Sequence, residues 1–268
     1  MSFRICFPNG LKRAFTLSYD DNQIYDRRLV DMFNRNGLKG TFHLNSGKLG
    51  QENEVDHFVS ADEVKDLYKG HEVACHAVTH PYLSQLPDGL LMKEILDDRS
   101  NLENITGTIV RGMSYPYGDF SDRLISIASA VGIEYSRTVE NTGYFNIPAD
   151  FMKWHPTCHH NDAMKYVDDF LNGPHFRDMA LFYVWGHSFE FDRENTWDYM
   201  EEFCKKMGGH DSVWYATNIE IKDYMTAARS LIMSADTSII YNPTAIDVYV
   251  IKDEKVIKIP KGETIKVQ

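Results

Sequence analysis

Short apolar stretches that alternate with amphipathic stretches are the feature that most limits the folds open to this chain. Apolar stretches of this length, bounded by Gly, Pro, Asn and Asp, are typical of buried strands, and a 3.6-residue apolar period is typical of helices. The sequence predicts strands at residues 13–19, 39–44, 71–75, 108–114, 133–138, 179–185 and 213–215. It predicts helices at residues 24–36, 60–69, 89–105, 121–131, 161–172, 195–207 and 217–229.

Strands that alternate with helices predict a parallel sheet, because parallel neighbours need a crossover connection. The length of 268 residues and the strand number favour a distorted or incomplete (β/α) barrel over an open sheet. After residue 230 the pattern becomes β-like, with turns near Pro243 and Asp253. We therefore predict an α/β barrel domain at residues 1–230 and a small antiparallel β appendage at residues 231–268.

Composition excludes several classes of function. The formal charge of -11 argues against a nucleic-acid partner, which needs a basic face. No apolar run is long enough to span a bilayer, and the first residues lack the apolar stretch of a secretory signal. Four scattered cysteines without a Cys-x-x-Cys pair suit reduced, buried thiols, so we expect a cytoplasmic protein, although a trimmed secreted form fits the sequence equally. Nothing in the sequence indicates the oligomeric state.

The strand at residues 13–19 runs into two adjacent carboxylates, Asp20 and Asp21. Successive side chains of a strand point to opposite sides, so two acids at its end can do different work. One can bind a metal ion while the other remains free as a base. Asp and Asn also favour helix caps and turns, which is the alternative interpretation of residues 20–22.

Two histidines four residues apart, His76 and His80, follow the strand at residues 71–75. On a helical turn this spacing brings both rings to one face. Two imidazoles and a carboxylate make a common divalent-metal site with open positions, and Asp21 is the natural third ligand. Surface or capping histidines are the alternative. Tyr117 and His187 also follow strands, and β/α barrels assemble their active sites at the carboxyl ends of strands.

Four motifs in the same order resemble the polysaccharide deacetylases, the family-four carbohydrate esterases with the nodulation-deacetylase homology domain. Ser-Tyr-Asp-Asp-Asn at residues 18–22 stands where that family has Thr-Phe-Asp-Asp-Gly. His-Ala-Val-Thr-His at residues 76–80 matches its His-Ser/Thr-x-x-His, and Pro-Tyr-Gly at residues 116–118 matches its third motif. His187, after an apolar strand, matches its last motif. The likeness extends over about residues 10–230.

The resemblance implies a metal-dependent hydrolase that removes acetyl groups from an N- or O-acetylated sugar or glycan. Asp21, His76 and His80 would hold a divalent metal, with zinc the first choice. Asp20 would be the general base and His187 the general acid.

The resemblance also implies roles for residues around this centre. The backbone N–H of Tyr117 would complete an oxyanion hole. Pro116, Trp185 and Trp154 would contact the substrate, with Trp185 beside the acetyl methyl group and Trp154 as the remnant of the family's Asp-Trp motif.

Several positions depart from the family pattern. Asn22 replaces Gly, and Asn is the next most tolerant residue of a left-handed turn. Ala77 replaces the Ser or Thr that braces the second motif, so the histidines must be held in another way. Arg111 lies five residues before Pro116, a spacing that disfavours its bridge to the base. Glu190 is a candidate partner for the ring of His187, or else a solvated loop acid.

Other interpretations remain open at this point. The same scaffold could hydrolyse another non-peptide C–N bond, or it could be a non-catalytic carbohydrate-binding relative. A non-haem iron oxygenase also uses two histidines and one carboxylate. His155, His159 and His160 could bind substrate, a second metal, or only form a polar loop, and His43 suits a core or supporting role better than ligation.

Overall fold

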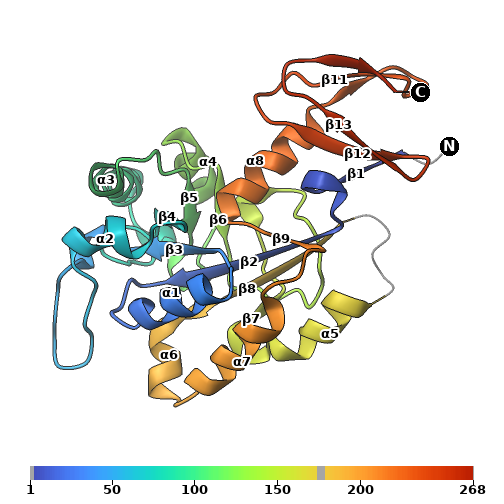
Figure 1. Cartoon of the computed structure of the whole chain (residues 1–268). Helices are drawn as coiled ribbons and strands as arrows, with labels where there is room; N and C mark the ends of the chain where they lie inside the picture. Colours follow the sequence, from blue (N-terminus) through green and yellow to red (C-terminus); the bar gives the residue numbers. More distant parts are fainter. Residues whose placement is uncertain (1–2, 174–178, 268) are drawn as a thin grey trace.

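A curled parallel sheet forms the centre of the computed structural model, which describes residues 3–173 and 179–267 (Figure 1). The strand order is β6-β5-β4-β3-β2-β8-β7, and β9 pairs with the first half of β2. All neighbours in this sheet run parallel. The strands are β2 (Arg13–Asp20), β3 (Gly40–Leu44), β4 (Glu72–Cys75), β5 (Gly112–Ser114), β6 (Tyr135–Arg137), β7 (Cys158–His159), β8 (Ala180–His187) and β9 (Val213–Tyr215).

Helices cover the outside of this sheet, as the sequence predicts for a parallel sheet with crossovers (Figure 1). They are α1 (Asp26–Arg35), α2 (Ala61–Leu67), α3 (Asp88–Thr106), α4 (Asp122–Ala130), α5 (Met164–Asn172), α6 (Ser188–Arg193), α7 (Trp197–Met207) and α8 (Asn218–Arg229). Between β6 and β7 the described residues make only one isolated parallel bridge, Arg137 to Trp154. The predicted distorted or incomplete (β/α) barrel is therefore confirmed.

Two elements differ from the prediction. β5 is only three residues long, although the sequence favours a strand over residues 108–114. The short helix α6, which starts directly after His187, is absent from the prediction. A six-residue helix carries too few residues for a clear apolar period, and its start depends on a capping box between His187 and Glu190.

The C-terminal residues form antiparallel β structure, as predicted, and an N-terminal strand joins them. β1 (Phe3–Cys6) pairs with β12 (Val248–Lys252), which pairs with β13 (Lys255–Ile259). A second small sheet contains β10 (Ile232–Met233), β11 (Ile239–Tyr241) and β14 (Thr264–Lys266). The hydroxyl of Tyr224 on α8 donates to the Cys6 carbonyl at 2.6 Å and accepts from the Tyr249 amide at 3.1 Å. Ala14 and Leu181, near the starts of β2 and β8, share one core with this β unit. The unit therefore packs at the end of the barrel where the strands begin.

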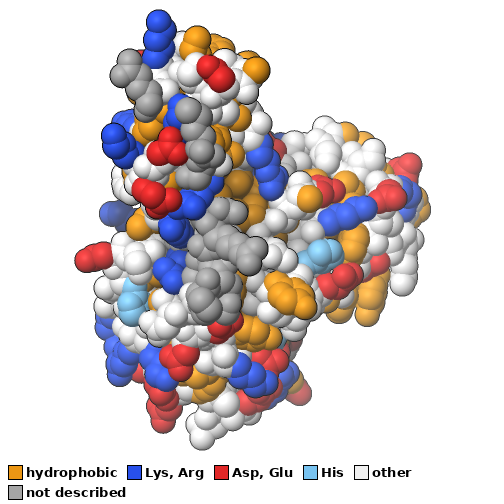
Figure 2. Space-filling model, turned by 90° about the vertical axis from the view of Figure 1, so that its right-hand side faces the viewer, with side chains coloured by type: hydrophobic (Ala, Val, Ile, Leu, Met, Phe, Trp, Pro, Cys, Tyr) orange, Lys and Arg blue, Asp and Glu red, His pale blue; other side chains and the backbone are white. Residues whose placement is uncertain are grey.

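The described surface carries charged side chains of both signs. On the face drawn in Figure 2, Lys and Arg side chains are mixed with Asp and Glu side chains over the described residues. Among those residues, no helix combines the length and the apolar character that a membrane crossing requires.

A buried carboxylate joins the first two helices and gives a prediction about stability. Asp26 accepts a hydrogen bond from the Tyr68 hydroxyl at 2.7 Å. Burial raises the pKa of Asp26 to about 7, although the hydrogen bond from Tyr68 opposes the rise. The folded state therefore binds a proton that the unfolded state has released, so the free energy of unfolding should fall as the pH rises from about 4 to about 7.

We expect Asp26→Asn to flatten this part of the pH profile. The fall in the free energy of unfolding between about pH 4 and about pH 7 should shrink by a few kcal/mol at most, because each unit of pKa shift corresponds to about 1.4 kcal/mol. Urea denaturation at a series of pH values measures the slope. Asp31→Asn, at an exposed position on the same helix, is the matched control and should keep the wild-type slope. Identical slopes for wild type and Asp26→Asn would contradict the prediction.

Candidate active site

The parallel register brings the predicted site residues to one edge of the sheet. Asp20 at the end of β2 lies opposite His187 on β8 and His43 on β3. Ser114 at the end of β5 lies opposite Arg137 on β6. Because all these strands run in the same direction, their last residues meet at the carboxyl end of the barrel.

Three side chains at this edge are arranged as metal ligands. Asp21 Oδ1 lies 3.8 Å from His76 Nε2 and 3.6 Å from His80 Nε2, and the three ligand atoms fall within 4.8 Å of one another. Ligands about 2.1 Å from a tetrahedral ion are separated by about 3.4 Å, so small movements suffice to close on a cation. The buried Asp21 Oδ1 has no hydrogen-bond partner among the described residues, as expected of an atom kept for an ion.

Both imidazoles are in the neutral form, which is the form that binds a metal ion. Burial lowers the pKa of His76, and burial together with the neighbouring His76 lowers the pKa of His80 to about 4. Both rings are therefore neutral at pH 7. His76 Nδ1 lies 3.0 Å from the Ser114 carbonyl oxygen, an acceptor, so Nδ1 carries the hydrogen and Nε2 presents its lone pair.

The backbone around these ligands is held in a strained conformation. Asp21, Ala77, His80 and Tyr117 have φ values of 75°, 63°, 61° and 60°. Each non-glycine residue in this left-handed region costs about 1–2 kcal/mol. Asn22, with φ of 37°, also enters this region, as expected for the residue that replaces the family's Gly. Such strain persists only where the surrounding structure enforces it.

Hydrogen bonds to the backbone provide that support in the absence of a Ser or Thr at position 77. The Asn45 side-chain amide donates to the carbonyls of His76 at 2.5 Å and Ala77 at 2.9 Å. Asp98 on α3 accepts from the His76 amide at 3.0 Å. The expectation that other groups hold these histidines is therefore confirmed.

Asp20 is a buried, ionised carboxylate. Ser114 Oγ donates to its Oδ1 at 3.0 Å, and Arg137 Nη2 donates to its Oδ2. Burial alone would raise the pKa of Asp20, but the charge of Arg137 outweighs it and holds that pKa well below its usual range. Asp20 is thus ionised throughout the neutral pH range.

The arginine that pairs with Asp20 comes from an unexpected strand. Arg111 instead bonds to Asp223 at 2.6 Å and Glu134 at 3.0 Å, which confirms that its spacing is wrong for the base. Arg137 is completely buried, and its guanidinium also donates to Ser18 Oγ at 3.1 Å. The sequence does hold one indication of this pairing, since Arg137 lies at the end of the predicted strand 133–138. A charged residue on a buried strand needs a partner, because charged residues are almost never buried without one.

His187 lies between two carboxylates. Its Nε2 is 3.8 Å from Asp21 Oδ2, and its Nδ1 is 3.3 Å from Glu190 Oε2. Burial opposes its protonation, but contact with Glu190 and the charges of Asp20 and Asp21 together raise the pKa of His187. Glu190 is mostly buried, and its carboxylate also accepts from the backbone amide of His187 at 3.3 Å, so it is a partner of this ring and not a solvated acid.

Two aromatic side chains lie at the rim of the site. The Tyr117 ring is 54% exposed, stacks on Tyr82 with centroids 4.0 Å apart, and meets the His80 ring edge-on at 4.4 Å. Trp185 lies over the Arg137 guanidinium at 4.6 Å, and its ring N–H donates to Asn141 at 2.8 Å. Both can therefore face a molecule that enters the site.

Two expected substrate contacts are wrong. Trp154 is completely buried against Phe151 and Tyr183, both with ring centroids at 4.9 Å, so its ring cannot stack on a substrate. It fills the space beside the open seam of the barrel, where its backbone bridges to Arg137. Pro116 is also buried, and it shapes the turn before Tyr117.

The three histidines of residues 155–160 separate into two places. His155 contacts Thr138 Oγ1 at 2.7 Å, whereas His159 and His160 face Glu190. His43 is buried, and its Nε2 lies 3.0 Å from Ser18 Oγ. A supporting position for His43, linked to Arg137 through Ser18, agrees with the sequence prediction.

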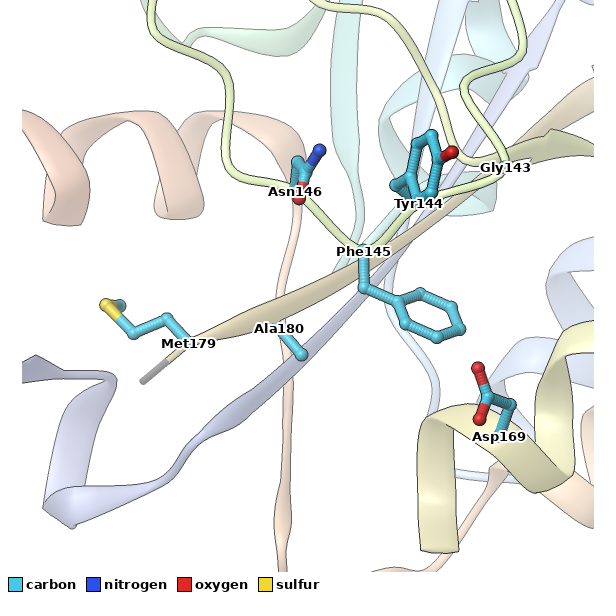
Figure 3. A pocket seen from close by; sticks show the side chains of 7 residues that line it. All are labelled: Gly143, Tyr144, Phe145, Asn146, Asp169, Met179 and Ala180. Carbon is cyan, nitrogen blue, oxygen red and sulfur yellow. The ribbon is translucent and has the colours of Figure 1, made fainter. Parts of the chain in front are cut away.

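A separate hollow of about 440 Å³ lies at the opposite end of β8 (Figure 3). Phe145, Met179 and Ala180 line it, with Asp169 of α5 on one side. Ala180 begins β8, whereas His187 ends it, so this hollow is remote from the candidate active site.

Comparisons with known proteins agree with this geometry. Residues 8–136 match the sequence profile of the family described as polysaccharide deacetylase. A chitin deacetylase from Arthroderma benhamiae is 34% identical over 124 residues, which cover 44% of this chain and 30% of that protein. The match thus spans less than a third of that relative's own length. The predicted resemblance to the polysaccharide deacetylase family is confirmed over this part of the chain.

Solved structures extend the likeness in fold beyond that segment. A family 4 carbohydrate esterase from Streptomyces lividans, in complex with acetate, is 16% identical with a TM-score of 0.50 and covers 77% of this chain and 93% of its own. A family 4 pseudoenzyme from Bacillus anthracis is 19% identical with a TM-score of 0.51 and covers 82% and 68%. The shared fold therefore includes both an esterase and a pseudoenzyme.

The buried pair of Asp20 and Arg137 gives a prediction about folding. Arg137→Gln leaves a buried carboxylate without its counter-charge, so we expect a loss of about 3–5 kcal/mol in the free energy of unfolding. Arg111→Gln is the matched control. Its ion pairs are partly exposed, so about 1 kcal/mol or less should be lost.

Urea denaturation of both variants measures the difference. Asp20→Asn combined with Arg137→Gln should recover part of the lost stability, because the uncompensated charge is gone. Equal losses for Arg137→Gln and Arg111→Gln would contradict the assigned pairing.

Proposed function

We propose that this chain is a metal-dependent hydrolase that removes acetyl groups from an N- or O-acetylated carbohydrate. One observation carries the proposal: the three-ligand cluster of Asp21, His76 and His80 lies beside an ionised carboxylate, Asp20, and an imidazole of raised pKa, His187. A hydrolase needs such a base and such an acid at the same pH.

Asp21, His76 and His80 would hold the divalent cation, with zinc the first choice for two imidazoles and one carboxylate. When bound, such a cation supplies Lewis acidity, which polarises an acyl carbonyl and acidifies water. The protein residues provide the remaining chemistry.

Asp20 would accept the proton of the attacking water. Arg137 and Ser114 fix the orientation of this carboxylate, so the base is already in place before a substrate enters. His187 would donate a proton to the departing amine or alcohol, with Glu190 keeping the ring oriented. The backbone N–H of Tyr117 would bind the developing oxyanion, and the left-handed backbone at this residue sets its direction.

The aromatic rim supports a carbohydrate as the substrate. Tyr82 and Tyr117 are each about half exposed and stacked, and they lie next to His80. Aromatic faces with a polar edge suit sugar rings, which combine apolar C–H faces with hydroxyl groups. The matching relative acts on chitin by its name, which favours an N-acetylated glycan over an ester.

A non-catalytic carbohydrate-binding protein is the second candidate, because a family 4 pseudoenzyme shares this fold. The presence of the proposed base, acid and all three ligands in one place counts against it.

Acetate release from acetylated chito-oligosaccharides and acetylated xylan, with and without a chelator, tests the proposal. We expect turnover that the chelator removes and that added Zn²⁺ restores. Asp20→Asn should lower turnover by about 10²–10⁴-fold while its metal content stays at the wild-type level. Full turnover in Asp20→Asn would reject the base, and the absence of acetate from every substrate would favour the binding protein.

The aromatic rim has its own test. Tyr82→Ala should raise KM for an acetylated oligosaccharide several-fold and leave the hydrolysis of a small acetyl ester nearly unchanged. Tyr144→Ala is the matched control, because Tyr144 is also exposed but lines the remote hollow of Figure 3. Equal changes on both substrates would argue against sugar stacking at Tyr82.

A further inference from the structure

A second group of metal-ligand side chains lies beside the candidate active site. His159 Nε2 is 3.1 Å from Glu190 Oε2, and His160 Nε2 is 3.4 Å from the same oxygen. The three ligand atoms fall within 4.8 Å of one another. The expected separation of ligands around a tetrahedral zinc ion is about 3.4 Å, so this group matches a cation at least as closely as the first cluster does.

The ring of His160 is rigidly placed. It packs between Tyr19, with centroids 5.8 Å apart, and Phe191, with centroids 4.1 Å apart. It also lies directly against the backbone of β8 at Gly186, where an added Cβ would come within 2.0 Å of His160 Nδ1. Glycine at this position is therefore what allows the ring to approach the strand and aim Nε2 at Glu190.

His160 is completely buried, yet neither of its ring nitrogens has a hydrogen-bond partner among the described residues. A buried polar atom without a partner costs about 1–3 kcal/mol, so such an atom indicates a group that binds there.

We propose that His159, His160 and Glu190 form a second divalent-cation site, separate from Asp21, His76 and His80. Its two imidazoles and one carboxylate suit Zn²⁺ or a similar transition-metal ion. His187 lies between the two sites, with Nδ1 3.3 Å from Glu190 and Nε2 3.8 Å from Asp21. The proposal goes beyond the deacetylase activity and does not depend on it, because binding of the ion requires no turnover.

Zn²⁺ titration of the chelator-treated full chain, followed by calorimetry and by metal analysis after gel filtration, tests the second site. We expect two Zn²⁺ per wild-type chain. His159→Gln should retain one, with at least tenfold weaker binding at the second site, and Asp21→Asn should also retain one. The combined variant should bind neither ion. His155→Gln, which changes a histidine of the same segment outside the cluster, is the matched control and should bind two.

Thermal melting of each metal-free variant shows whether it remains folded, and His159 is suited to this test because it is partly exposed. Neither ligand group contains a cysteine, so Co²⁺ substitution should give no thiolate charge-transfer band at either site. A single Zn²⁺ in the wild type that Asp21→Asn removes and His159→Gln leaves unchanged would overturn the second site. Two Zn²⁺ retained in His159→Gln would also overturn it. Neither result would bear on acetate release, so failure here and failure of the proposed function are distinguishable.

Discussion

The ion pair between Asp20 and Arg137 is the interaction on which the candidate active site depends. Both side chains are excluded from solvent, so each charge would be prohibitively costly without the other. Such a pair adds little net stability compared with apolar packing, and its value lies in the fixed position of an ionised carboxylate. Ser18 and His43 extend the network behind the arginine, so the base is held through residues of three strands, β2, β3 and β6.

The same site collects conformational strain. Two of the proposed ligands, Asp21 and His80, and their neighbours Asn22, Ala77 and Tyr117 have left-handed backbones, and together these residues cost several kcal/mol. Asn45, Asp98 and Ser114 offset part of this cost with hydrogen bonds to the loop that carries His76. The strained loop thus keeps the ligands close together before an ion arrives.

The sequence predicts the barrel and the strand-end cluster because both depend on local signals. Apolar periodicity defines β2 and β8, and a strand end determines where Asp20, Asp21 and His187 emerge. Arg137 was not predicted, because its pairing with Asp20 joins residues 117 positions apart on non-adjacent strands. Trp154 was assigned to the substrate because an aromatic residue near a motif looks the same whether it lines a cleft or fills a seam. Only the tertiary packing distinguishes these cases.

His187 lies between the two clusters of candidate metal ligands, because its ring contacts Asp21 of the first cluster and Glu190 of the second. In this structure one oxygen of Glu190 faces three imidazoles, those of His159, His160 and His187. This one oxygen cannot accept a full hydrogen bond from all three rings, and the unpartnered Nε2 of His160 reflects this shortage. A cation at His159 and His160 would supply the missing partner and would draw on the charge of Glu190 that otherwise acts on His187. The electrostatic environment of the proposed acid would then depend on the occupancy of the neighbouring site, through a carboxylate that α6 fixes in place.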